Sequence, residues 1–153
     1  MKIKNLFVVF LLLITSCGKE DANLFEKADK EYQKKNLKTA IDLYKHFAQK
    51  YPESSKAPEA LFKLAQIYLN DLRLPKEAVG YFEQIVQKYP NTREAMNALF
   101  MLGFIYANEI HDYNKAREHY QKFLEQYPNS ELAISAKFEL ENLGKEPEKI
   151  LTK

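Results

Sequence analysis

The chain has 153 residues, enough for a domain with a sizeable hydrophobic core, and 46% of them are hydrophobic, which excludes an intrinsically disordered protein. Its 23 basic and 21 acidic residues give a formal charge of +2, and because Lys2 and Lys4 precede Cys17, the chain from Cys17 onward carries 21 of each sign. No basic excess marks that part of the chain, so no nucleic-acid partner is expected.

The composition favours helices throughout. Only four residues are glycine, and Ala, Leu, Lys, Glu and Gln, which lose little on entering a helix, are frequent. The sequence therefore predicts an all-α protein.

The chain begins with a basic head, Met1 to Lys4, followed by nine uninterrupted apolar residues from Leu6 to Ile14. A helix that crosses a bilayer needs about 20 apolar residues, so this run is too short for a permanent span. A basic head followed by a short apolar run is typical of a secretory signal peptide, which we predict over residues 1–16.

The four residues before the charged segment, Ile14-Thr15-Ser16-Cys17, resemble the lipobox of bacterial lipoproteins. The resemblance implies cleavage before Cys17, a diacylglycerol on its sulfur and an acyl chain on its new amine. A lone cysteine cannot form an internal disulfide, which leaves lipidation or an ordinary signal peptide followed by a buried thiol. We expect lipidation, with residues 17–21 as the tether to the membrane.

The residues after Cys17 bear on localisation. Gly18, rather than Asp, follows the cysteine, which in the best-known lipoprotein sorting rule favours the outer membrane. Lys19-Glu20-Asp21 is similar to a signal that sends some lipoproteins to the cell surface, and it also fits acids at the start of a helix. An anchor in the outer membrane is expected, on the periplasmic face, with the cell surface as the alternative.

An internal repeat of 38 residues is the strongest pattern in the sequence. Tyr-Pro recurs at this spacing, as do an alanine and an aromatic residue before it. The repeated positions are Tyr51-Pro52, Tyr89-Pro90 and Tyr127-Pro128; Ala40, Ala78 and Ala116; and Tyr44, Phe82 and Tyr120.

Each repeat contains two helical patterns. In the second repeat, apolar residues recur every three or four positions on both sides of a break that ends at Pro75, a residue suited to the first turn of a helix. Each Tyr-Pro step should end a second helix, because a residue before proline is pushed out of the α region. Small residues in the first helices (Ala28, Ala65, Gly103) should let the second helices approach closely.

These residues resemble the tetratricopeptide repeat family. The third repeat matches the family pattern at Leu99, Leu102, Gly103, Tyr106, Ala116, Tyr120, Phe123 and Pro128. The resemblance implies a right-handed α-solenoid of three helix pairs with a C-terminal capping helix that stops at Gly144. The expected bounds are residues 22–144 for the domain, with repeats at 22–54, 58–92 and 96–130, a cap at 131–144 and a tail at 145–153.

The long period and the lipobox together resemble one branch of that family, the bacterial envelope lipoproteins. This branch includes the lipoprotein of the outer-membrane β-barrel assembly machinery, and the Tol-associated cell-division coordinator is a similar periplasmic protein. Three repeats and no heptad segment distinguish this chain from both.

Catalytic motifs are absent from the sequence. His46, His111 and His119 are not spaced with a third ligand as in a metal site, and solvated surface is the expected place for all three. No enzyme activity, metal or cofactor is therefore expected.

In the family, ligands lie in the concave groove lined by the first helices, on the stripe that does not face the partner helix. Carried over to this sequence, that stripe is Phe25, Asp29, Tyr32, Phe62, Gln66, Leu69, Asn70, Asn97, Phe100, Phe104, Asn108 and Phe138. Phe62, Phe100 and Phe138 are 38 residues apart, so they would form an aromatic ladder for a protein or peptide partner. The alternative is that these rings are half-buried contacts between adjacent first helices.

Together these patterns predict a lipid-anchored adaptor that binds a protein or peptide through this groove, in outer-membrane or cell-envelope assembly and maintenance. The alternative function is a surface-exposed accessory lipoprotein that captures glycans or peptides as nutrients.

Overall fold

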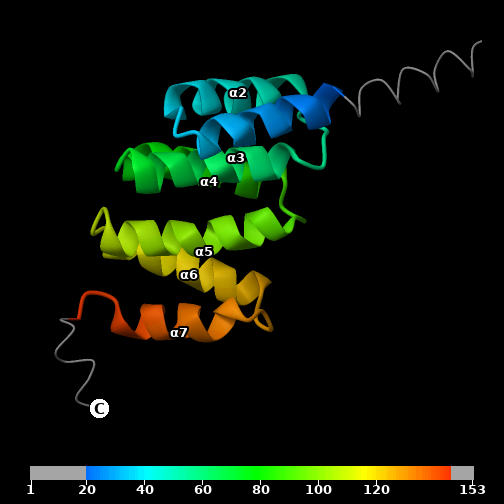
Figure 1. Cartoon of the computed structure of the whole chain (residues 1–153). Helices are drawn as coiled ribbons and strands as arrows, with labels where there is room; N and C mark the ends of the chain where they lie inside the picture. Colours follow the sequence, from blue (N-terminus) through cyan, green and yellow to red (C-terminus); the bar gives the residue numbers. More distant parts are fainter. Residues whose placement is uncertain (1–19, 146–153) are drawn as a thin grey trace, which may run out of the picture. The chain divides into compact units, whose positions relative to one another are not determined.

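The computed structural model describes residues 20–145, and the chain forms two compact units, Met1–Lys63 and Leu64–Lys153. The predicted signal peptide and Cys17 lie outside the described residues. Helices account for all the regular structure of the described part, which contains no strand, so the all-α prediction is confirmed (Figure 1).

The first unit contains a helix over residues 20–33, helix α2 (Leu37–Lys50) and the first part of α3 (Ala57–Gln66). The first helix starts within the segment predicted as a tether, because residues 20 and 21 are already helical. Phe25 packs edge-on against Tyr44 and Phe47 of α2, with ring centroids 5.8 and 5.4 Å apart. The two helices therefore share an aromatic core.

The second unit continues α3 as a π-helical turn, η1 (Ile67–Asp71), followed by four α-helices, which are α4 (Pro75–Lys88), α5 (Arg93–Asn108), α6 (Tyr113–Gln126) and α7 (Leu132–Asn142). Figure 1 shows α5, α6 and α7 stacked in sequence order. Pro75 occupies the first turn of α4, as predicted. The wide turn at η1 was not predicted from the sequence, and it is closed by a bond from the Leu72 N–H to the Ile67 carbonyl at 3.0 Å.

Each second helix ends at the tyrosine of a Tyr-Pro step, as predicted. Tyr51, Tyr89 and Tyr127 have left the α region, with φ between −127° and −130° and ψ between 49° and 57°. The carbonyl of each tyrosine then accepts a bond from the backbone N–H three residues later, at 3.1 to 3.2 Å. The same turn is therefore built three times.

The close approach between helices is confirmed for α5 and α6. A methyl group built at Gly103 would lie 2.7 Å from the ring of Tyr120, so only glycine fits there. Gly144 follows α7 with φ of 73°, a left-handed conformation that suits glycine, and it stops the capping helix as predicted.

Candidate functional site

The predicted groove residues of the first unit mostly serve the fold. Phe25 is 1% exposed and faces α2, so its assignment to a stripe that avoids the partner helix is wrong. Asp29 is half-buried and accepts a hydrogen bond from the Tyr44 hydroxyl, and the Lys63 ammonium lies 3.4 Å from its carboxylate. Tyr32 and Phe62 are half-buried.

Burial and the Asp29 carboxylate both raise the pKa of the Tyr44 phenol above its ordinary value. Burial disfavours the phenolate, and a negative charge beside it does the same. Tyr44 is therefore a neutral donor, and Asp29 is the acceptor that satisfies it.

In the second unit, the predicted residues differ widely in exposure. Gln66, Asn70 and Asn108 are exposed, Asn97 and Phe104 are half-buried, and Leu69 is only 7% exposed, too little for contact with a partner. Phe100 is half-buried, with its ring edge-on at 5.7 Å from both Tyr120 and Phe123 of α6. Phe100 thus repeats the packing of Phe25, and its assignment to a stripe that avoids the partner helix is also wrong.

Phe138 is the exception among these rings. It occupies on α7 the position that Phe100 occupies on α5, but it is 52% exposed, because α7 is the last helix of the described part and no second helix covers it. A continuous ladder through Phe62, Phe100 and Phe138 remains a prediction, since Phe62 belongs to the first unit.

The structure brings two predicted site residues, Asn108 and Phe138, into one hollow of about 270 Å³ between the ends of α5 and α7. We call it the α5/α7 hollow. Its lining residues are Ala107, Asn108, His111, Tyr113, Phe138, Glu139, Asn142, Leu143, Gly144 and Lys145.

Two asparagines are held in place in this hollow by their own helices. The Asn108 side-chain amide donates to the Phe104 carbonyl at 3.0 Å, and that of Asn142 donates to the Phe138 carbonyl at 2.8 Å. An amide has two N–H donors and one carbonyl acceptor, so each keeps an N–H for a further partner. Such an N–H can donate a hydrogen bond to a carbonyl oxygen of a bound peptide backbone.

Aromatic surface completes the lining. Tyr113 is 43% exposed at the start of α6, and its ring centroid lies 6.5 Å from that of His111. His111 has a left-handed backbone, with φ of 61°, and its Nδ1 lies 3.2 Å from the Ala107 carbonyl oxygen. Sequence reasoning missed Tyr113. The clue was its repeat position: the other two repeats have Leu37 and Pro75 there, so an aromatic residue at this position could have indicated a site specific to the third repeat.

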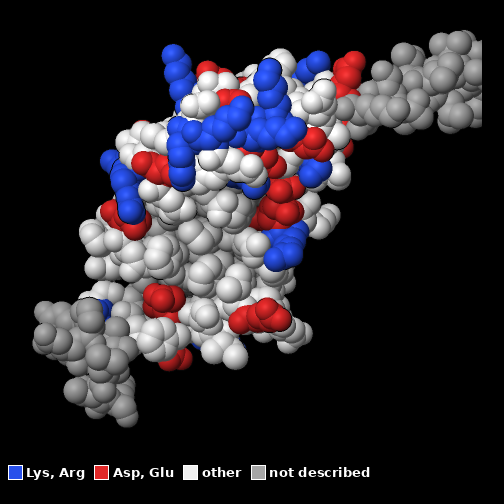
Figure 2. All heavy atoms as spheres, in the orientation of Figure 1, with Lys and Arg blue, Asp and Glu red and all other residues white. Residues whose placement is uncertain are grey.

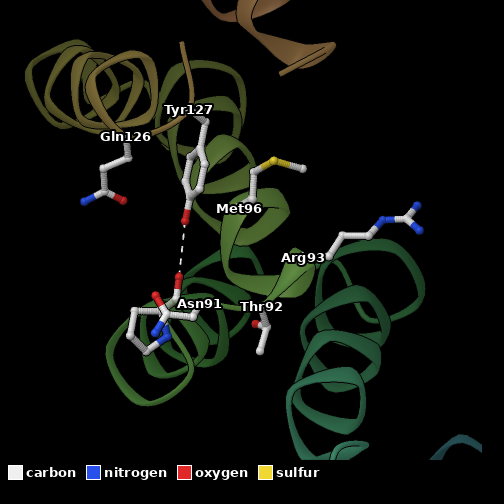
Figure 3. Close-up of a pocket in the computed structure, with 7 residues that line it drawn as sticks. Asn91, Thr92, Arg93, Met96, Gln126 and Tyr127 are labelled. Carbon is white, nitrogen blue, oxygen red and sulfur yellow. Dashed lines mark hydrogen bonds between the residues drawn. The ribbon is translucent and has the colours of Figure 1, made fainter. Parts of the chain in front are cut away.

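A larger hollow of about 600 Å³ lies between the turn before α5 and the end of α6 (Figure 3). None of its lining residues was predicted as a site; they are Pro90, Asn91, Thr92, Arg93, Met96, Gln126 and Tyr127. The Tyr127 hydroxyl donates to the Pro90 carbonyl at 3.3 Å, the dashed line in Figure 3, and so joins two copies of the Tyr-Pro turn. This role in the fold makes the larger hollow a weaker candidate than the α5/α7 hollow.

His119 is not the solvated residue that the sequence suggested. Its ring is stacked on Tyr106, with centroids 5.3 Å apart and planes 3° from parallel, and its Nδ1 is buried without a hydrogen-bond partner among the described residues. Burial lowers the pKa of His119, because the charged imidazolium loses its hydration. His46 and His111 are exposed, as expected.

The charge on the surface differs between the units. On the face drawn in Figure 2, basic side chains gather over the first helix and α2, whereas the surface over α5 and α7 shows few basic groups and only separate acidic ones among uncharged residues. A surface with scattered charges and exposed rings favours apolar anchors in a partner over an ionic contact.

The family model of an outer membrane lipoprotein, YfiO, matches residues 18–146. The chain belongs to this lipoprotein family. Membership confirms the resemblance to the helical-repeat envelope lipoproteins and places the protein at the outer membrane, held by a lipid anchor. No curated protein matches the sequence. Among the residues that the structure describes, no helix of this chain is long and apolar enough to span a bilayer.

Proposed function

We propose that this YfiO-family protein is a lipid-anchored adaptor that binds a segment of a partner protein in the α5/α7 hollow, in the assembly and maintenance of the outer membrane or cell envelope. It performs no chemistry itself. The signal peptide 1–16 is removed, and Cys17 carries the lipids that hold the adaptor at the membrane.

One observation carries the proposal of partner binding: Phe138 is half exposed at a hollow whose lining also includes two asparagine amides and the ring of Tyr113. Exposed aromatic residues beside polar groups are typical of contact surfaces between proteins. Family membership supports an envelope role, because the matched family is one of outer membrane lipoproteins.

The lining suggests how a partner segment would be held. Phe138 and Tyr113 offer apolar surface to an anchor residue, while Asn108 and Asn142 can bond with the backbone of the segment. Glu139 and Lys145 also line the hollow, and their charges cancel. The preferred partner is therefore a peptide or helix with an apolar anchor rather than a strongly charged segment.

A photo-crosslinking experiment tests this proposal. A benzoylphenylalanine is placed at position 138 in one lipidated variant and at position 134 in another, and crosslinked partners are identified by mass spectrometry. Ile134 is 81% exposed on the same helix but does not line the hollow, so it is the matched control. We expect an envelope protein to crosslink at 138 and not at 134, and equal crosslinking at both positions would reject the hollow as the site.

The role in nutrient capture at the cell surface is less well supported. Lys19-Glu20-Asp21 is the segment that is similar to a cell-surface signal, and its two acids make contacts within the fold. Asp21 accepts a hydrogen bond from the Ser54 hydroxyl at 2.7 Å, and Glu20 accepts one from the Tyr51 hydroxyl at 3.3 Å. These contacts favour the interpretation of the acids as part of a helix start. Protease digestion of intact cells separates the two functions, since only a surface-exposed protein is cleaved without permeabilisation.

A further inference from the structure

The start of the first helix lies close to the membrane if Cys17 is lipidated. Three peptide units separate Cys17 from residue 20, where the described helix has already begun. An extended chain spans at most about 3.6 Å per residue, so the helix start lies within about 11 Å of the anchored cysteine. This end of the first unit is therefore at the level of the lipid headgroups.

The end of α2 lies at the same place, because the first helix and α2 run antiparallel. Contacts between their ends show this: the Tyr51 hydroxyl donates to the Glu20 carboxylate, and the Lys50 ammonium lies 3.9 Å from that carboxylate. Side chains from both helix ends consequently face the same membrane surface.

These two helix ends form a hollow of about 380 Å³, which we call the anchored-end hollow. Its lining includes two lysines, Lys27 and Lys50, together with Asn23, Leu24 and His46. No carboxylate oxygen of the described residues lies within 4 Å of the Lys27 ammonium. One acid, Glu20, also lines the hollow, so its formal charge is +1 with histidine neutral.

We propose that the anchored-end hollow binds the phosphate of an anionic phospholipid headgroup, in the membrane that holds the lipid anchor. This proposal rests on the lipidation of Cys17, which belongs to the proposed function. Lys27 and Lys50 pair with the phosphate, the Asn23 amide donates a hydrogen bond, and Leu24 contacts the glycerol.

The lipid anchor makes weak headgroup contacts effective. Once the chain is attached, the headgroups are at a high effective concentration, so binding orients the protein rather than recruiting it. Each lysine near an anionic surface contributes enough for about a fivefold change, so the pair changes the ratio of docked to undocked protein about 25-fold.

The test uses the mature lipidated protein in vesicles of phosphatidylcholine, with or without 30 mol% phosphatidylglycerol. Cys17 is the only cysteine and its sulfur carries the lipid, so Ser55→Cys provides a single reactive thiol on the exposed turn beside the hollow. A fluorophore on that thiol is quenched by a spin-labelled headgroup when this end lies at the membrane.

We expect stronger quenching in vesicles with phosphatidylglycerol, and loss of the increase in Lys27→Gln/Lys50→Gln. The matched control is Lys35→Gln/Lys38→Gln, which removes the same charge near the turn at the other end of the two helices and should keep the increase. Equal quenching in both vesicles, or an equal loss in both double variants, would overturn the proposal.

Failure of the anchor is distinguished from failure of the hollow. The mass of the purified protein shows whether Cys17 carries lipid before any vesicle is made, and an unmodified Cys17 would overturn both proposals. A lipidated protein whose quenching is indifferent to phosphatidylglycerol would overturn only the headgroup site and leave the adaptor role standing.

Discussion

Gly103 of α5 lies directly against the ring of Tyr120 on α6, at a distance that leaves no room for a methyl group. Tyr120 is fully buried, so its ring cannot move aside. We expect Gly103→Ala to lower the free energy of unfolding by about 1 to 3 kcal/mol through overpacking. Urea denaturation followed by circular dichroism measures the change.

Gly80 provides the control for that substitution. It is an exposed glycine inside α4, and a methyl group there would meet nothing within 4 Å. Gly80→Ala should therefore stabilise the protein by about 0.5 to 1 kcal/mol, because alanine loses less backbone entropy than glycine. Equal effects at both positions would contradict the close approach of α5 and α6.

Two buried tyrosines at equivalent repeat positions should respond differently to loss of their hydroxyl groups. Tyr44 donates to Asp29, whereas the Tyr120 hydroxyl has no partner among the described residues. Tyr44→Phe should cost about 1 to 2 kcal/mol of unfolding free energy, and Tyr120→Phe should be neutral or stabilising by up to about 1 kcal/mol. The urea unfolding midpoint of each variant, compared with that of the wild type, measures these changes. A large loss of stability in Tyr120→Phe would reveal a partner for that hydroxyl.

The burial of His119 predicts a dependence of stability on pH. Its pKa is lowered by burial in the folded state, whereas the unfolded chain has the ordinary value of about 6.5. Below that pH the unfolded chain gains a proton that the folded protein does not, so stability falls as the pH falls towards the folded-state pKa. Of the neighbouring charges, Glu118 and Glu83 oppose this shift, and Lys122 and Lys115 add to it.

Urea midpoints at pH 7.5 and 5.5 test this dependence. His119→Gln should lose less stability than the wild type between the two pH values, since the titrating group is gone. His46→Gln removes an exposed histidine and should retain the wild-type difference. If His119→Gln shows the full wild-type drop, carboxylates rather than His119 cause it.

Phe25 and Phe138 should separate the requirements of folding from those of binding. Phe25 is 1% exposed between two rings of α2, so Phe25→Ala should cost about 3 to 5 kcal/mol of unfolding free energy. Phe138 is half exposed, so Phe138→Ala should cost about 1 kcal/mol or less. Thermal melts measure both values, and a similar cost at the two sites would show that Phe138 belongs to the core.

The repeat spacing was sufficient to predict much of the fold. The Tyr-Pro steps predicted the ends of three helices, because proline restricts the residue before it whatever the surroundings. Pro75 and Gly144 likewise marked a helix start and a helix stop through local backbone preferences. These features depend on neighbouring residues in the chain, so the sequence contains them directly.

The exposure of the aromatic residues depended on packing between helices. Phe25, Phe100 and Phe138 look alike in sequence, but the first two lie against a following helix and the third does not. The α5/α7 hollow also joins Asn108 to Phe138, from helices separated by the whole of α6. A pattern along one helix identifies its apolar face, but the neighbouring helix determines whether that face is covered, and only tertiary structure places that neighbour.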